Sequence, residues 1–276
     1  MVDPEITLTT LHDFCADRLG PRVATRFVGL ARPGFALTEA EPGQAAGHSR
    51  FGGRALLEPG TPWPTCDGFP LSLLAVLDAD VLAPWLGDLL PAGTGLLNFF
   101  ALDSDSEQGD PAAHEVALAH HSTDPRVGRV IAARAAHAVE TRAPARSSVF
   151  EPVPWAASPG FSLPDAFDPA WDSLARSPGA EHLDSYDIRT ALSDWPEQPG
   201  ALCADDTAFG RPVFPTGSYP TVPEGEDPNR YHHLLQLSDH HEWSIGGEGG
   251  WMHWSIPTDA LRAGDFGRAI PTPDHW

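Results

Sequence analysis

The segment between residues 232 and 253 is rich in side chains that bind metals. It holds five histidines and two interleaved carboxylates: His232, His233, His240, His241, His253, Asp239 and Glu242. Imidazole and carboxylate together are common ligands of zinc, iron and nickel. Because side chains alternate between the two faces of a strand, His232 can share a face with His241 or His253 but not with His233. His232, His241 and His253 are therefore the candidate metal ligands.

A structural role for the same histidines is the favoured interpretation. The segment lacks the HExxH and HxH patterns that bring two histidines to one metal ion. The pair His120-His121 would add ligands only if the fold brought it close. We therefore expect hydrogen-bonded or exposed histidines and no cofactor, and we keep a metal site as the alternative.

A run of glycines follows the histidines. Gly246-Gly247-Glu248-Gly249-Gly250 has the composition of a phosphate-binding loop, but such loops precede a helix, and the aromatic residues after Gly250 are typical of a strand. The run predicts a tight β-turn with positive φ at two glycines, Gly250 among them, and with Glu248 at its tip. The candidate binding residues of this region are Gln236, Glu248, Trp251, His253 and Trp254. The tryptophans also fit a buried core.

Two common catalytic devices have no basis in this sequence. The chain contains no lysine, since its 17 cationic side chains are all arginines, and this excludes Schiff-base lysines and the phosphate-binding lysine of P-loops. No GxSxG pattern marks a serine nucleophile. A protein without enzymatic activity is therefore favoured.

The overall charge limits the partners. The formal net charge is −21, whereas nucleic acids and anionic lipid surfaces are bound by cationic surfaces that displace their counterions. No stretch approaches the roughly 18 apolar residues of a membrane span. We expect a protein or peptide partner, for which a basic surface would suit this acidity, and neither nucleic acid nor membrane.

The cysteines and the N-terminus indicate the compartment. Cys15, Cys66 and Cys203 lie far apart and in no CxxC spacing, which is typical of buried thiols in a reducing environment. The first residues lack the basic start and apolar run of a signal peptide. The expected localisation is cytoplasmic.

The elements that position these residues are expected to be short, because 26 glycines and 29 prolines favour turns over long helices. Apolar spacing and capping residues predict helices over 7–19 with Thr7 as cap, 21–30, 80–90, 168–174, 181–192 and 257–261. A strand is expected over the histidine- and alanine-rich run that ends near residue 124. Residues 126–139 fit a strand by their branched residues and a helix by their alanines, and the strand is favoured. A proline-rich stretch over 144–164 is expected to cross the surface.

The order of elements occurs twice. Each half has a Phe-Gly step, a short apolar strand and then glycines that lead into an aromatic strand. The first set is Phe51-Gly52, 71–77 and 95–101, and the second is Phe209-Gly210, 233–237 and 250–256. Offsets of about 158, 160 and 155 residues indicate a duplicated β-rich unit, whose two strand pairs should occupy equivalent places.

We expect one compact domain over residues 1–276. Its parts are N-terminal helices over 1–35, a first repeat half over about 48–125, a proline-rich excursion with helices over about 140–195, and a second repeat half over about 207–270.

These repeated segments resemble the YwqG-like family, a bacterial domain of unknown function. The similarity covers about residues 48–270, and its motifs are Arg50–Gly53, Pro59–Pro64, Pro70–Asp78, Gly93–Phe100, His233–Leu237, Gly249–Trp254, Asp259–Leu261 and Asp265-Phe266. Family members tend to have glutamine where this chain has Val76 and Asn98, and Gln236 is kept.

The resemblance implies an α+β, mostly β fold: a duplicated unit of coiled and branching antiparallel sheets with a few short helices. It implies no established activity. Family members can occur beside toxin-type genes, which suits a regulatory or toxin-immunity role. Our hypothesis from the sequence is a non-enzymatic binding or interaction module with an acidic groove. The alternative is a metal-dependent hydrolase, or another small-molecule enzyme, that uses the 232–253 histidines.

Overall fold

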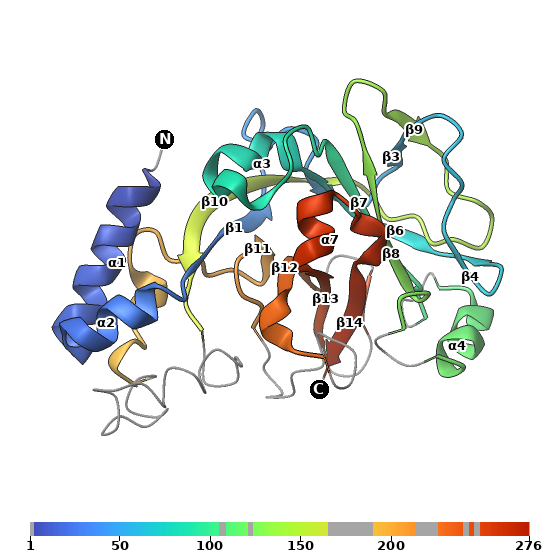
Figure 1. Cartoon of the computed structure of the whole chain (residues 1–276). Coiled ribbons are helices and arrows are strands. Elements are labelled where there is room, and N and C mark those ends of the chain that lie inside the picture. The colour runs from blue at the N-terminus through green and yellow to red at the C-terminus, as the bar shows by residue number, and fades with distance from the viewer. Residues whose placement is uncertain are drawn as a thin grey trace.

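One antiparallel sheet carries most of the fold (Figure 1). The computed structural model describes residues 3–104, 109–120, 124–164, 190–213, 226–239, 243–245 and 249–275. Within them the sheet has ten strands, in the spatial order β14 (Ile270–His275), β13 (Gly250–Pro257), β12 (Tyr231–Ser238), β11 (Asp206–Phe209), β1 (Arg32–Glu39), β10 (Val153–Ser162), β2 (Arg50–Phe51), β6 (Ser72–Asp78), β7 (Leu96–Ala101) and β8 (Gly128–Ala133). The mostly β, α+β fold class expected from the sequence is confirmed.

Short helices and two small sheets surround the large sheet (Figure 1). The described helices are α1 (Pro4–Leu19), α2 (Pro21–Val28), α3 (Ala79–Leu86), α4 (Pro111–Leu118) and α7 (Thr258–Ala263), with 3-10 turns η1 (Gly87–Leu89), η2 (Trp195–Glu197), η3 (Pro228–Arg230) and η4 (Phe266–Arg268). The small sheets pair β3 (Ala55–Leu57) with β9 (Val139–Thr141) and β4 (Thr65–Cys66) with β5 (Phe69–Pro70). None of the helices in the described part of the chain is both long and apolar enough to cross a membrane.

The large sheet curls around an apolar core until its two edge strands touch. A Cβ added at Gly128 on β8 would lie only 2.7 Å from a side-chain carbon of Pro271 on β14. Inside the curl, Trp254 of β13 meets Phe99 of β7 with ring centroids 5.4 Å apart, and both rings are fully buried. Strands that are far apart in the sheet therefore share one interior.

The strand order repeats on the two sides of the β1–β10 pair. Outward from that pair come β11, β12, β13 and β14 on one side and β2, β6, β7 and β8 on the other. The pairs β6–β7 and β12–β13 share a one-residue register shift, between Leu73 and Ala75 in one and between His233 and Leu235 in the other. The two strand pairs thus occupy equivalent places. Strand β1 is the neighbour of β11 in the second half, as β10 is the neighbour of β2 in the first.

Backbone conformation corrects the sequence match between the halves. Gly52 and Phe209 both have a left-handed backbone, with φ of 60° and 59°, and the residues after them, Gly53 and Gly210, have φ of 78° and 74°. Gly52 is therefore equivalent to Phe209, and the match of Phe51-Gly52 with Phe209-Gly210 is wrong by one residue. A phenylalanine seldom adopts this conformation, so the surrounding strands must hold it there.

A buried amide in each half binds backbone groups of the chain segments next to β2 or β11. In the first half, Asn98 on β7 accepts a hydrogen bond from the Leu56 N–H and donates one to the Leu56 carbonyl, each at 2.8 Å. In the second half, Gln236 on β12 accepts from the Val213 N–H at 3.0 Å and donates to the Asp205 carbonyl at 2.9 Å. Each amide replaces the ladder partners that these backbone groups lack.

Two expected elements differ in the structure. The first helix begins at Pro4, because Asp3 is its cap and accepts from two N–H groups of the first turn, while Thr7 lies inside the helix. The histidine- and alanine-rich run expected as a strand is the helix α4, which Asp110 caps. Both errors come from missing a capping aspartate followed by proline, which is a strong helix start.

The proline-rich stretch expected to cross the surface contains β10, which lies at the centre of the sheet. Its prolines argued against this place, because proline cannot donate to the hydrogen-bond ladder and is rare in central strands. The strand expected within 126–139 and the helices expected over 80–90 and 257–261 are confirmed by β8, α3 and α7. The helix expected over 168–174, and the next one up to residue 189, lie outside the described residues.

Candidate functional site

A pocket of about 260 Å³ lies where β1 and β12 meet the helices α3 and α7. Its charged or titratable lining residues include Arg32, Arg262, His232 and Asp88, and leucines such as Leu86 and Leu261 supply apolar wall. Helix α3 belongs to the first half and α7 to the second, so both halves contribute to one cavity. We call it the arginine pocket.

Two arginines near this pocket are held by backbone carbonyls. Arg32 begins β1, and its Nη1 donates a 3.2 Å hydrogen bond to the carbonyl of Tyr231. Arg211 comes two residues after β11 and is buried, and its Nε and Nη2 donate to the carbonyl of Leu30 at 2.8 and 2.7 Å. A third arginine, Arg262 on α7, is exposed. The carbonyl bonds fix two guanidinium groups and leave the third adjustable.

The pKa of His232 reflects its burial and the charges near the pocket. Its pKa is lowered from 6.5 to about 4, first by burial and then by the positive charges of Arg32, Arg262 and Arg211. An imidazole resists protonation where cations surround it. His232 is therefore neutral near pH 7, and three arginines act on it although the chain as a whole carries −21.

The tight chain path after β11 sets the position of Arg211. A Cβ at Gly210 would lie 2.6 Å from the Leu202 side chain and 2.9 Å from Oγ of Ser162, at a φ of 74°. The N–H of Arg211 donates to the same Ser162 oxygen at 2.7 Å. Glycine at 210 therefore lets the chain pass close to β10 and turn Arg211 inward.

Two of the three predicted metal ligands, His232 and His253, can be placed, and they lie apart. His232 opposes Ile256, a residue of the apolar core, whereas His253 lies on the other face of the sheet. His253 is fully buried and packs beside His233, with ring centroids 5.6 Å apart. His241 lies outside the described residues. The pair that the described strands bring together is therefore His233 with His253, and not His232 with His253.

The outer face of the second half is polar and buried. It carries Thr207, His233, Gln236, His253, Ser255, Thr272 and Asp274, each at most 5% exposed. Burial lowers the pKa of His233 to about 4 and that of His253 well below its usual value. Within the described part of the chain, Nε2 of His233 and the Thr272 hydroxyl have no hydrogen-bond partner. Both imidazoles are therefore neutral near pH 7.

The other predicted binding residues have different surroundings. Trp254 is buried in the core, whereas Trp251 is partly exposed and its Nε1 donates to the Asp205 carbonyl at 3.0 Å. Glu248 lies outside the described residues. The positive φ expected at Gly250 belongs instead to Gly249, at 124°, because Gly250 already pairs as the first residue of β13.

Sequence reasoning missed the arginines and one further cluster. Residues 32, 211 and 262 carry no common motif, and only strand pairing brings them together. In the part of the chain that the structure describes, the side chains spaced so that they could hold a metal ion are Cys66, Asp67 and His120. Cys66 was expected to be a buried thiol, and His120 was considered only with His121.

The fold and the pocket define a duplicated, mostly β protein with a cationic cavity. The chain belongs to the family described as Domain of unknown function (DUF1963), whose model matches residues 49–274. The matched range covers every strand of the large sheet except β1, and it ends one residue before the end of β14. A search of curated proteins found no match. Family membership therefore assigns no activity, and the site itself has to suggest one.

Proposed function

We propose that this protein is a non-enzymatic binding module whose arginine pocket holds a small ligand with a carboxylate or phosphate group. The observation that carries this proposal is the convergence of Arg32, Arg211 and Arg262 on His232 in a strongly acidic chain. Guanidinium groups bind planar carboxylates and phosphates through paired, charge-assisted hydrogen bonds.

The arrangement of charges suits a bound anion. Arg32 and Arg262 line the pocket beside Asp88, and Arg211 is close enough to lower the pKa of His232. Guanidinium groups gathered in this way attract an anion. Arg32 is positioned before a ligand arrives, whereas Arg262 can move to meet it. The pocket thus combines a fixed cation with an adjustable one.

Size and net charge limit the ligand. A cavity of about 260 Å³ is slightly below the roughly 300–1,000 Å³ of common ligand pockets, so it suits a small molecule. A net charge of −21 repels extended polyanions such as nucleic acid or an anionic membrane. A protein or peptide partner would have to insert a single carboxylate or phosphate group.

This proposal revises the hypothesis drawn from the sequence. A cytoplasmic, YwqG-like binding module remains our interpretation, with a regulatory or toxin-immunity role as its setting. The acidic groove for a basic partner is replaced by a cationic pocket for an anionic ligand. The hydrolase alternative loses support, because His232 and His253 lie on opposite faces of the sheet.

Arg262→Ala is expected to weaken the binding of inorganic phosphate and of citrate by about tenfold or more, because it removes a charged hydrogen-bond donor from the pocket. Arg262 is exposed, so the free energy of unfolding should change by no more than about 0.5 kcal/mol. Isothermal titration calorimetry with both probes measures the affinities, and urea unfolding checks the fold.

Arg54→Ala is the matched control. Arg54 is also exposed, and it pairs with Glu140 away from the pocket lining. The control should bind both probes as the unchanged protein does. If neither probe binds, or if Arg262→Ala binds both with unchanged affinity, the proposed function is wrong.

Anion binding at pH 6 is expected to take up protons. The pKa of free His232 is about 4, so this imidazole is almost entirely neutral at pH 6. A bound anion favours the imidazolium form and raises that pKa. Calorimetric titrations with sulfate, which does not titrate near pH 6, in two buffers with different ionisation enthalpies measure the uptake, and His232→Gln should abolish it. Equal uptake by the variant would place the anion away from His232.

A further inference from the structure

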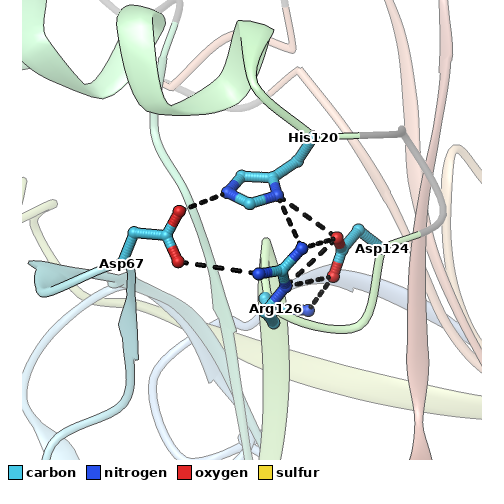
Figure 2. Close-up of polar contacts among 4 residues, drawn as sticks. All are labelled: Asp67, His120, Asp124 and Arg126. Carbon is cyan, nitrogen blue, oxygen red and sulfur yellow. Dashed lines mark hydrogen bonds and ion pairs between the residues drawn. The ribbon is translucent and has the colours of Figure 1, made fainter.

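Side chains of two distant segments meet beside the β4–β5 turn, as Figure 2 shows for Asp67, His120, Asp124 and Arg126. Cys66 ends β4, Asp67 follows it in the turn, and His120 comes shortly after α4. One side-chain ligand atom of each of Cys66, Asp67 and His120 lies within 4.8 Å of the other two. Nε2 of His120 is 2.9 Å from Oδ2 of Asp67.

We propose that Cys66, Asp67 and His120 bind a divalent transition-metal ion of the zinc type. Thiolate, carboxylate and imidazole are zinc ligands, with metal–ligand bonds of about 2.0–2.3 Å. Donor atoms around such an ion lie roughly 3–4 Å apart, so atoms already within 4.8 Å reach it by small side-chain movements. Water or a ligand fills the fourth position of a tetrahedral ion.

Metal binding releases a proton from the protein and water molecules from the ion. The Cys66 thiol releases its proton to solvent, and its sulfur forms a bond to the ion. Nε2 of His120 gives up the proton that it shares with Asp67, and Nδ1 takes up a proton from solvent, so the ring changes tautomer and stays neutral. Nε2 and one oxygen of Asp67 then form the other two bonds, and the ion loses the water molecules that they replace. The contact between His120 and Asp67 is exchanged for two bonds to the same ion.

A carboxylate behind His120 supports this assignment. Oδ2 of Asp124 lies 3.2 Å from Nδ1 of His120, on the side of the ring away from Asp67 (Figure 2). In the metal-free arrangement Nη2 of Arg126 donates to Nδ1 at 3.1 Å, so the ring proton is on Nε2 and faces Asp67. When Nε2 bonds a metal the ring proton is on Nδ1, and Oδ2 of Asp124 accepts it there. The His120 side chain is only 4% exposed, so its ring is also held by packing.

Arg126 balances the charge of that supporting carboxylate. Its Nη2 lies 2.7 Å from Oδ2 of Asp124 and 3.1 Å from Nδ1 of His120, and its Nε lies 3.0 Å from Oδ1 of Asp124. Arg126 therefore pairs with Asp124 through two donors, and its Nη1 also lies 3.7 Å from Oδ1 of Asp67. With a metal ion bound, the three negative charges of Asp67, Asp124 and the Cys66 thiolate are balanced by the positive charges of Arg126 and the divalent ion.

This site is separate from the arginine pocket in its residues. None of Cys66, Asp67 and His120 lines that pocket. The His232, His241 and His253 set that the sequence suggested is not involved either. Metal binding and anion binding can therefore be measured independently, and failure of one leaves the other intact.

The experiment titrates Co²⁺ into the reduced, metal-free protein and records its absorption spectrum. A variant with Cys15→Ala and Cys203→Ser keeps Cys66 as its single thiol. We expect a 1:1 complex with a thiolate-to-cobalt charge-transfer band in both proteins, and Zn²⁺ should displace the Co²⁺. A spectrum without the thiolate band in both proteins overturns the proposal.

Two further variants test the other donors and the supporting residue. His120→Gln should lower the affinity for Co²⁺ by at least tenfold, because it removes a ligand. Asp124→Asn should weaken binding by about 10- to 100-fold but keep the thiolate band, since it disturbs only the orientation of His120. Circular dichroism confirms that each variant is folded. Unchanged affinity in folded His120→Gln would show that Co²⁺ binds elsewhere.

Discussion

Acidification from pH 7 to pH 5 should lower the free energy of unfolding by about 4 kcal/mol through His233 and His253 and by about 2 kcal/mol more through His232. His253→Asn should remove about a third of the total loss. Burial lowers the pKa of His233 to about 4 and that of His253 well below 6.5. Both imidazoles are fully enclosed on the outer face of the second half.

The sign follows from proton binding. In the unfolded chain all three histidines titrate near 6.5, so between pH 6.5 and pH 4 the unfolded state binds protons that the folded state does not. Stability is therefore fully present above about pH 6.5 and decreases as the pH falls. At pH 5 each histidine costs about 2 kcal/mol, which is large against a typical total of about 5–15 kcal/mol.

Urea unfolding at pH 7 and pH 5 measures the effect. Asparagine is the chosen replacement because Asn98 occupies the position equivalent to His253 in the first half. His137→Asn is the control, since His137 is exposed and should leave the pH dependence unchanged. If His253→Asn loses as much stability between the two pH values as the unchanged protein, then His253 is protonated in the folded state.

Trp254→Ala should lower the free energy of unfolding by about 3–5 kcal/mol. The indole of Trp254 is fully buried where both ends of the curled sheet meet, and it packs edge-on against Phe99 at 5.4 Å and 73°. Alanine would leave a cavity that strands on both sides cannot close. A core role also means that the folded variant should still bind phosphate.

Trp251→Ala is the matched control on the same strand. Trp251 is partly exposed on the opposite face, and its Nε1 donates to the Asp205 carbonyl. Its loss should cost about 1 kcal/mol, the usual contribution of one hydrogen bond. Chemical denaturation of both variants gives the comparison. Equal losses would contradict the placement of Trp254 in a shared core.

Local sequence was informative where neighbouring residues decide the structure. The helices after Asp78 and Pro257, and the strand pairs β6–β7 and β12–β13, follow from apolar spacing and from short connections. The order of elements also revealed the repeat. Matching the two halves by sequence missed the one-residue offset between Gly52 and Phe209, because no residue pattern indicates a positive φ at a phenylalanine.

The candidate sites were poorly predicted because their residues come from distant segments. The histidines at 232–253 are close in sequence, yet strand alternation sends His232 and His253 to opposite faces. Cys66 and His120 come together only because the β4–β5 turn lies beside the end of α4. No local pattern encodes such a contact.

The sequence by itself determined the mostly β character, the duplicated order of strands and the acidity that opposes binding to nucleic acid. Tertiary structure decided that β1 and β10 pair at the centre of the sheet and that Arg32, Arg211 and Arg262 all lie near enough to His232 to lower its pKa. The physical reason is that turns and strand periodicity depend on neighbouring residues. Strand partners, and the charges that they bring together, depend on burying one common core.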